Sequence, residues 1–362
     1  MRDALHAYSN LTSFAPFTTP LFSSIWLPLR RDAVGRIHPG RGAILKWGAA
    51  EGDKKQMAFV ITPYPEFSWS ISRQRLFEQC PRAYYFRYYL SHNGWLDEAS
   101  PRARQAWTLG KLTTLDALLG GEIDARAREL EACAREGRPF PTAADMEGRT
   151  REALRTAWRS SKDREAFESH PNRVTMLRSF YLDQEPPAEE EVARLNHKLP
   201  LCMERLRSLA DWERLAACGA QGCVPIPAFA HFFLDEVKVF AAADLAYVHE
   251  GRLYSIDWKS GRAGDDDEVQ VLLQVVGLQR THDGLDGLPV TATLHYLAQG
   301  REERVTIPSA LKEEVREVVT QGVRGMRAYL HDPEWNIPLE EAEFPRCPSA
   351  LCRFCGFGPL CE

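Results

Sequence analysis

The chain lacks the features that mark several broad classes of protein. No apolar run among its 362 residues approaches the roughly 18 residues that a membrane-spanning helix needs, so we expect a soluble protein with no membrane partner. The formal net charge is −5, which excludes the uniformly basic surface of a protein that only coats nucleic acid. The phosphate-binding pattern G-x-x-x-x-G-K-S/T is also absent, so nothing in the sequence predicts a nucleotide-driven motor.

Cysteine usage excludes a disulfide framework. The nine cysteines are an odd number and the chain has no recognisable secretory signal, so we expect a reducing compartment, the cytoplasm. Three of them, Cys352, Cys355 and Cys361, are spaced C-x2-C-x5-C near the end of the sequence. This close spacing is typical of ligands to a metal or a cluster.

The first part of the chain is atypical of a folded domain. Residues 1–56 contain a short apolar stretch that is interrupted by prolines and lacks a basic start followed by a cleavage site. We predict that 1–56 is a poorly structured N-terminal extension and that the folded domain occupies 57–362. Met57 is a plausible alternative start of the protein.

Helical signals open the predicted domain. Ser70 can cap a helix that runs to about Leu90 and is rich in arginine and aromatic residues. Because Pro81 removes a backbone donor inside this helix, we predict a kink just after Cys80.

A longer helical region follows. Residues 104–135 are predicted to form a helix with a break at Gly120 and Gly121, and apolar residues at three-to-four spacing continue the helical pattern over 143–217. We interpret about 120–220 as a helical insertion into the domain.

The pattern changes to strands at Val224. A hairpin is predicted around Gly251, with Asp244 at the start of its first strand and Asp257 and Lys259 near the end of its second. The elements expected after it are a helix over 265–280, a second hairpin over 290–307 and a final helix over 309–330. Strands and helices in this order predict an α/β core.

Two aspartates and a lysine in the first hairpin suggest a site for phosphodiester hydrolysis. This reaction needs a divalent cation, and Mg²⁺ and Mn²⁺ prefer carboxylate oxygens such as those of Asp244 and Asp257. Since side chains alternate along a strand, Asp257 and Lys259 point to one face and Trp258 to the core on the other. The lysine can orient the attacking water or stabilise the charge that develops at phosphorus.

The C-terminal cysteines require a fourth ligand. We expect Cys80 to supply it, with Cys347 as the alternative, so that residues 340–362 clasp back onto the start of the domain. Four thiolates hold either a zinc ion or an iron–sulfur cluster. Structural zinc usually shows paired C-x2-C knuckles, and one such knuckle is present here, so the spacing favours a cluster over zinc.

The hairpin residues resemble the PD-(D/E)XK nuclease superfamily, in its RecB-like branch. The resemblance implies a restriction-endonuclease-like α/β core with a mixed central sheet flanked by helices. It also implies that Asp244 and Asp257 bind Mg²⁺ or Mn²⁺ and that Lys259 is catalytic. Gln274 matches the glutamine of the family's glutamine-x-x-x-tyrosine motif, although Leu278 occupies the tyrosine position.

A second departure concerns an early helix. The family usually carries a histidine metal ligand four residues after a glycine, whereas Gly110 is followed at that interval by Thr114. Loss of an imidazole ligand predicts weaker binding of manganese.

The cysteines extend the resemblance. Cys80, followed by Pro81 and Arg82, together with the terminal C-x2-C-x5-C is similar to AddB-type and CRISPR-adaptation nucleases of the same superfamily. This implies a 4Fe–4S cluster that joins the N-terminal helix to the C-terminus. Its ligands would be Cys80, Cys352, Cys355 and Cys361. The resemblance as a whole covers residues 68–90, 225–300 and 340–361.

Basic and aromatic residues near Cys80 are candidates for contacts with nucleic acid. Arg73, Arg82 and Arg87, with Lys111 further along, can contact phosphates, and Tyr84 can stack on unpaired bases. Nothing resembles a sequence-reading helix or finger, so we expect binding that tolerates many sequences.

Together these features predict a metal-dependent DNA nuclease with a structural 4Fe–4S cluster. We expect an exonuclease or end-processing enzyme that acts on single strands, in DNA repair, recombination or CRISPR adaptation. A separate helicase subunit or CRISPR-adaptation proteins would be its partners. The alternatives are a catalytically silent subunit that binds DNA ends in a helicase–nuclease complex, and a structural protein stapled by zinc.

Overall fold

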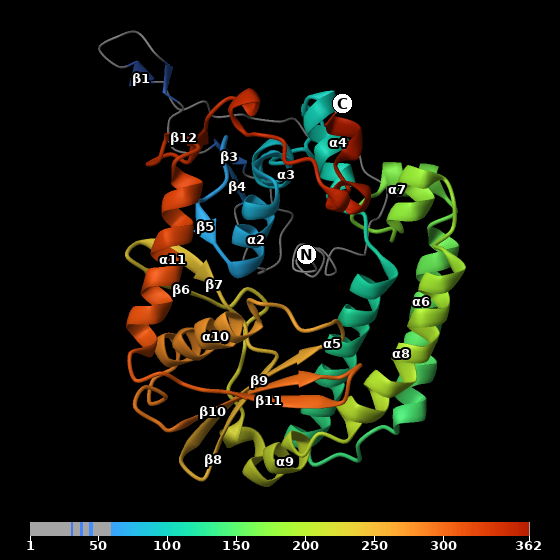
Figure 1. Cartoon of the computed structure of the whole chain (residues 1–362), viewed down its shortest axis with the longest axis vertical. Helices are drawn as coiled ribbons and strands as arrows, with labels where there is room; N and C mark the ends of the chain where they lie inside the picture. The colour runs from blue at the N-terminus through green and yellow to red at the C-terminus, as the bar shows by residue number, and fades with distance from the viewer. Residues whose placement is uncertain (1–29, 32–36, 39–42, 46–58, 362) are drawn as a thin grey trace, which may run out of the picture.

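A computed structural model describes residues 30–31, 37–38, 43–45 and 59–361 of the chain (Figure 1). Most of the predicted extension 1–56, and Met57, lie outside these residues. Three short strands are described within the extension, and a fourth begins the domain: β1 (Arg30–Arg31), β2 (Ile37–His38), β3 (Ala43–Leu45) and β4 (Phe59–Ile61). Strand β1 pairs with β2 and β3 pairs with β4, both antiparallel.

The central sheet has four strands in the order β11-β10-β9-β8. They are β8 (Leu245–His249), β9 (Arg252–Lys259), β10 (Val290–Tyr296) and β11 (Arg301–Val305). Strands β9 and β10 run parallel and the outer pairs are antiparallel, so the sheet is mixed. Both predicted hairpins are present, and the first turns at Glu250 and Gly251 with φ of 48° and 70°, values that suit a tight hairpin turn.

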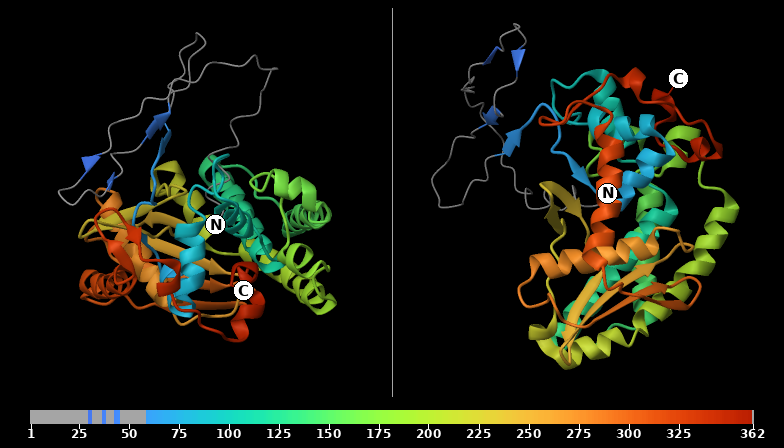
Figure 2. Two further views of the ribbon diagram at one scale, coloured as in Figure 1. Left: turned by 90° about the horizontal axis from the view of Figure 1, so that it is seen from above. Right: turned by 60° about the vertical axis from the view of Figure 1, so that its left-hand side comes forward.

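Helices cover both faces of this sheet, which confirms the predicted α/β fold (Figures 1 and 2). One face packs against α10 (Asp267–Thr281), beside which lies α11 (Leu311–Arg327). The other face contributes Ile256 and Trp258 to a second core that is shared with the helical segment. As predicted, Trp258 therefore points away from the face that carries Asp257.

The helical segment lies against the second face of the sheet. Its elements are α4 (Pro101–Leu109), α5 (Leu115–Glu136), α6 (Ala143–Ser160), α7 (Arg164–Ser169), the π-helical turn η2 (Ser179–Asp183), α8 (Glu189–Arg207) and α9 (Asp211–Gly222). The expected break at Gly120 and Gly121 is wrong, because α5 runs through both glycines. The break lies instead at Gly110–Thr114, where the Thr114 hydroxyl accepts a hydrogen bond from Ala117 N–H at 3.2 Å and starts α5.

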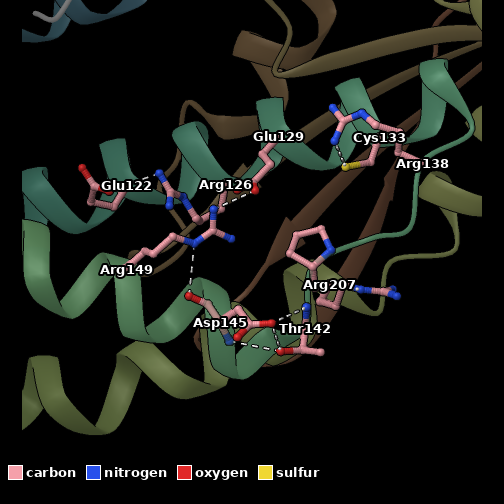
Figure 3. A network of polar contacts seen from close by, with 10 residues as sticks. Glu122, Arg126, Glu129, Cys133, Arg138, Thr142, Asp145, Arg149 and Arg207 are labelled. Atoms are coloured by element: carbon pink, nitrogen blue, oxygen red, sulfur yellow. Dashed lines mark hydrogen bonds and ion pairs between the residues drawn. The ribbon is translucent and has the colours of Figure 1, made fainter.

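Polar contacts hold α5 against α6 within this segment (Figure 3). Arg149 donates to the Glu129 carboxylate at 2.7 Å and to the Asp145 carbonyl at 3.3 Å. Thr142 caps α6 by accepting from the Asp145 N–H at 3.1 Å. A further link joins the segment to the sheet, since Arg205 on α8 donates to the carbonyls of Leu297 and Ala298, each at 2.7 Å.

The predicted helix 70–90 is interrupted rather than kinked. It consists of α2 (Ile71–Gln79), α3 (Pro81–Tyr85) and the π-helical turn η1 (Phe86–Leu90). Ser70 caps α2 as expected, with its side chain accepting from Arg73 N–H at 3.2 Å. Cys80 is extended (φ −164°, ψ 103°) and separates α2 from α3, because Pro81 starts a new helix more readily than it continues one.

Smaller elements complete the fold. A three-stranded sheet in the order β5-β7-β6 and a two-stranded ribbon of β12 and β13 lie outside the central sheet. Their strands are β5 (Ser68–Trp69), β6 (His231–Leu234), β7 (Val237–Phe240), β12 (Leu330–Asp332) and β13 (Ile337–Pro338). Three 3-10 helices end the chain: η3 (Glu341–Glu343), η4 (Ala350–Phe354) and η5 (Gly358–Leu360). Among the described residues, no helix is both long and apolar enough to cross a bilayer.

Candidate active site

The first hairpin brings the two predicted aspartates together. Asp244 directly precedes β8, and its N–H donates to the carbonyl of Ile256 on β9 at 3.2 Å. Because Leu245 is paired with Ile256, the register places Asp244 opposite Asp257. The hairpin therefore supplies two facing carboxylates, as the sequence predicts.

Asp257 is the centre of a hydrogen-bonded group at the end of β9. Its side chain is 1 % exposed. The Oδ1 atom accepts from Gln274 Nε2 at 2.8 Å and from Gln270 Nε2 at 3.2 Å, and Lys259 Nζ lies 2.7 Å from Oδ2. Lys259 also donates to Gln270 Oε1 at 2.9 Å, so strand β9 and helix α10 together hold the ammonium beside the carboxylate.

Gln270 is a member of this group that the sequence reasoning missed. It lies one helical turn before Gln274 and contacts both Asp257 and Lys259, whereas Gln274 contacts Asp257 and the Ala242 carbonyl at 3.0 Å. The four-residue spacing that places both glutamines on one face of α10 was the available signal. Counted from Gln270, the tyrosine position of the family motif falls on Gln274, while Leu278 is buried in an apolar cluster.

The electrostatics of Asp244 favour a cation. Burial, the neighbouring Asp257 carboxylate and the Asp124 carboxylate raise the pKa of Asp244 well above its ordinary value. The hydrogen bond from Trp258 N–H at 2.9 Å and the charge of Lys259 oppose this increase without cancelling it. Acidic groups crowded in this way are typical of sites at which a bound cation supplies the compensating positive charge.

Asp124 is the second residue that the sequence reasoning missed. It lies on α5 and accepts a hydrogen bond from Trp258 Nε1 at 3.1 Å, and its charge acts on Asp244. Thr114, in the position of the family's histidine, only caps α5 and lies ten residues before Asp124, about 15 Å along the helix. The same glycine-plus-four interval recurs from Gly120 to Asp124, and this repeat could have identified it.

The residues present fit a hard divalent cation in chemistry, although their geometry is not that of a closed site. The buried Gln274 Oε1 has no hydrogen-bond partner, and Asp257 Oδ2 meets only the Lys259 ammonium. Carboxylate and amide oxygens are ligands that Mg²⁺ and Mn²⁺ accept. In the part of the chain that the structure describes, no three histidine, cysteine, aspartate or glutamate side chains come together as a ligand set. Lys259 instead neutralises Asp257 from within the protein.

We expect the Asp244→Asn variant to be more stable than the wild type when metal is absent. A carboxyl whose folded-state pKa is raised costs stability as pH rises above its ordinary value of 3.8. At pH 7.5 the variant should therefore unfold about 2–4 °C higher, and the gain should shrink towards pH 4. Thermal unfolding at both pH values, with metal removed, measures this.

The matched control is Asp286→Asn. Hydrogen bonds and charge from Lys312, at 2.9 Å, lower the pKa of Asp286, so this variant should show no gain at pH 7.5. An Asp244→Asn protein that is less stable than the wild type at pH 7.5 would contradict the electrostatic account of the site.

The C-terminal segment docks beside Cys80. Arg82 donates its backbone N–H to the Pro345 carbonyl at 3.2 Å and its Nε to the Phe344 carbonyl at 2.8 Å. On α4, Arg102 donates to the carbonyl of Leu360 at 3.4 Å. Figure 1 shows the end of the chain beside α4. The two ends of the domain are thus in direct contact.

The four predicted cysteine ligands lie in this contact region. Cys80, Cys355 and Cys361 pack against one apolar cluster, and Cys352 is exposed. Burial raises the pKa of the Cys355 thiol, and the charges of Cys361, Cys80 and Cys352 raise it further. Phe357 N–H also donates to Cys355 Sγ at 3.4 Å. The thiols are near enough to influence one another, without forming a closed ligand set in the described residues.

The candidate nucleic-acid contacts divide into two pairs. Tyr84 is 2 % exposed and Arg82 is 9 % exposed, with its guanidinium bound to the Phe344 carbonyl and to Glu341. Packing of the helix against the core occupies both side chains in this structure, so their contacts with bases and phosphates stay predictions. Arg73 and Arg87 are half-buried and remain candidates.

A mixed sheet with two aspartates and a lysine on its first hairpin is the arrangement that the resemblance to α/β nucleases implies. A family model described as the PD-(D/E)XK nuclease superfamily matches residues 68–362. The chain belongs to this superfamily, whose members are generally phosphodiesterases that use Mg²⁺ or Mn²⁺. A search of the curated proteins found no match.

Proposed function

We propose that this protein is a metal-dependent DNA nuclease that cuts single strands or strand ends. The observation that carries the proposal is the hydrogen-bonded group of the buried Asp257 with Lys259 and Gln270, beside the raised-pKa carboxyl of Asp244. A structural role alone does not account for a lysine held against an aspartate while a second carboxyl crowds the same place. Membership of the nuclease superfamily supports the same reading.

Each side chain of the site has a separate role in this proposal. Asp244 and Asp257 would hold Mg²⁺ or Mn²⁺, which when bound supplies Lewis-acid polarisation of the phosphate. Asp124 would add negative charge beside Asp244 and so favour the cation. Lys259 orients the attacking water and stabilises negative charge at phosphorus. Gln270 and Gln274 are positioning residues, because they fix the Asp257 carboxylate and the Lys259 ammonium through hydrogen bonds.

The proposal includes a structural 4Fe–4S cluster held by Cys80, Cys352, Cys355 and Cys361. Its support is the gathering of four thiols from opposite ends of the domain, with charges that act on one another. The thiols whose charges raise the pKa of Cys361 are Cys80 and Cys352, which favours Cys80 over Cys347 as the fourth ligand. All four donors are cysteine sulfur, which suits iron–sulfur ligation.

The biological setting that we propose is DNA repair, recombination or CRISPR adaptation, in the RecB-like branch of the superfamily. The protein would act with a separate helicase subunit or with CRISPR-adaptation proteins, since the chain has no phosphate-binding loop to drive unwinding.

The deciding experiment compares the wild type with Lys259→Ala. Protein purified without oxygen is incubated with end-labelled single-stranded DNA and Mg²⁺ or Mn²⁺. We expect degradation by the wild type and at least about a 100-fold lower rate for the variant. The variant lacks the Lys259 ammonium that stabilises the negative charge of the transition state. The fate of the label gives the polarity of cleavage. Equal degradation by both proteins would show that Lys259 is not needed and would refute this assignment of the site.

A catalytically silent subunit that binds DNA ends is the second candidate. The departures at Thr114 and Leu278 from the family motif favour it. It predicts that wild type and Lys259→Ala bind DNA ends equally and that neither cleaves. A zinc-stapled protein, in contrast, would be colourless and would contain zinc and no labile sulfide.

A further inference from the structure

Three basic side chains from separate elements lie around the junction of η1 with the end of α4. Arg87 on η1 donates to the carbonyl of Gly110 at the end of α4. The Arg73 guanidinium, from α2, lies 4.1 Å from the centroid of the Tyr88 ring. Lys111 follows α4, and its Nζ lies 5.3 Å from the centroid of the Trp107 ring. We call Arg73, Arg87 and Lys111 the basic cluster.

The basic cluster has no acidic partner among the residues that the structure describes. Burial lowers the pKa of Arg87 and the charge of Arg73 lowers it further, while Tyr88 opposes this decrease through its charge and a hydrogen bond. Burial and the charge of Arg87 likewise lower the pKa of Lys111. Arg87 is thus repelled by Arg73 and repels Lys111, and withdrawal from water adds to this cost.

Neighbouring arginines behave differently. Arg75 on α2 pairs with Asp266 at 2.9 Å, and Arg102 on α4 pairs with Glu341 at 2.7 Å. Acidic partners are thus available on both sides of the basic cluster, yet none pairs with it. Like charges that are partly buried and unpaired suit an anion that arrives from outside.

We propose that the basic cluster binds a backbone phosphate of single-stranded DNA at a subsite separate from the scissile bond. The proposal rests on the proposed nuclease function. A polynucleotide phosphate fits because it is a fixed anion with several acceptor oxygens. Arg73 and Lys111 already lie over aromatic rings, so these side chains lose less conformational entropy when a phosphate binds.

The position of Lys111 relative to Asp124 sets the expected length of the strand. Lys111 lies just before α5, and Asp124 lies in the tenth position of α5, so the helical rise separates them by about 15–20 Å. For a single strand whose bases stay stacked, at about 3.4 Å per nucleotide, this span corresponds to about five nucleotides. An oligonucleotide of three nucleotides at the active site would therefore not reach the basic cluster.

The test measures binding instead of cleavage. Fluorescence anisotropy of a labelled single-stranded 20-mer is recorded over a range of NaCl concentrations in an Asp257→Asn background. Lys111→Gln and Arg73→Gln are each expected to weaken binding about three- to tenfold and to reduce the salt slope by about 0.7. Lys162→Gln, at an exposed lysine between α6 and α7, is the control and should change neither quantity. Arg87 is left intact because it also binds the Gly110 carbonyl.

A labelled trimer and inorganic phosphate complete the test. Lys111→Gln should leave binding of the trimer unchanged, because the trimer does not span both places. Equal weakening for trimer and 20-mer, or an unchanged salt slope with the 20-mer, would overturn the proposal. Weaker binding of inorganic phosphate with unchanged binding of the 20-mer would identify a small-anion site and overturn it as well.

Failure of this proposal is distinguishable from failure of the nuclease assignment. Cleavage by the wild type together with unchanged binding in Lys111→Gln refutes the subsite alone. Loss of binding in Lys111→Gln, with no metal-dependent cleavage by the wild type, refutes the nuclease alone and supports the basic cluster as a DNA contact.

Discussion

Replacing Asp257 by asparagine is expected to lower metal-dependent cleavage of single-stranded DNA by at least about 10³-fold. The change removes one of two facing carboxylates and the charge against which Lys259 is held at 2.7 Å. Loss of cation binding and of the positioned ammonium removes about 4 kcal/mol of transition-state stabilisation. Initial rates at saturating Mn²⁺ measure the effect, and thermal unfolding confirms that the variant folds.

Asp124→Asn is expected to lower the same cleavage rate about 100-fold. Raising the Mn²⁺ concentration should restore a larger share of this rate than it restores in Asp257→Asn. Asp124 acts on Asp244 from the opposite face of the sheet and would complete the acidic set. The matched control is Asp116→Asn on the same helix, whose carboxylate pairs with Lys198 at 2.6 Å and should affect stability alone. A fully active Asp124→Asn enzyme would refute a role for the third carboxylate.

Replacing Cys355 by serine is expected to abolish iron binding and to destabilise the whole domain. In the proposed cluster the four cysteines would close a loop of more than 270 residues between Cys80 and the C-terminal segment. Opening such a loop gives the unfolded chain more conformational entropy. The free energy of unfolding should therefore fall by at least about 2 kcal/mol, and the unfolding temperature by more than about 5 °C. Iron and acid-labile sulfide contents of protein purified without oxygen, with its visible absorbance, measure cluster loss.

Cys347→Ser provides the control for the cluster. This cysteine lies in the same segment but is not expected to be a ligand, so the variant should keep wild-type iron content and stability. Loss of iron from Cys347→Ser but not from Cys80→Ser would show that Cys347 is the fourth ligand. A wild-type protein that contains zinc and no sulfide would reject the cluster altogether.

The sequence predicted the hairpin of Asp244, Asp257 and Lys259 because the relevant information is local. Strand alternation alone places Asp257 and Lys259 on one face and Trp258 on the other, and the turn at Gly251 sets the register. Asp244 follows from that register, since it lies opposite Asp257. Each of these relationships spans fewer than about 15 residues, so backbone geometry determines it without reference to the rest of the fold.

Predictions from local sequence were least informative where one residue type is compatible with two different structural roles. The glycines at 120 and 121 suggested a helix break, yet α5 continues through them, because a threonine cap at Thr114 and dense packing specify the helix. Arginine and tyrosine near Cys80 suggested DNA contacts, yet Tyr84 and Arg82 are occupied by the core and by the C-terminal segment. Residue type indicates what a side chain can do, whereas burial decides whether it is available.

By itself, the sequence determined the α/β class, the hairpin that carries Asp244, Asp257 and Lys259, and the resemblance to a nuclease family. Only the tertiary structure revealed that Asp124, from a helix on the opposite face of the sheet, acts on Asp244. It alone also brought Arg73, Arg87 and Lys111 together from three elements. The physical reason is that pairing within a hairpin follows from chain geometry. Contacts between separate elements, in contrast, depend on how the whole set of apolar faces packs.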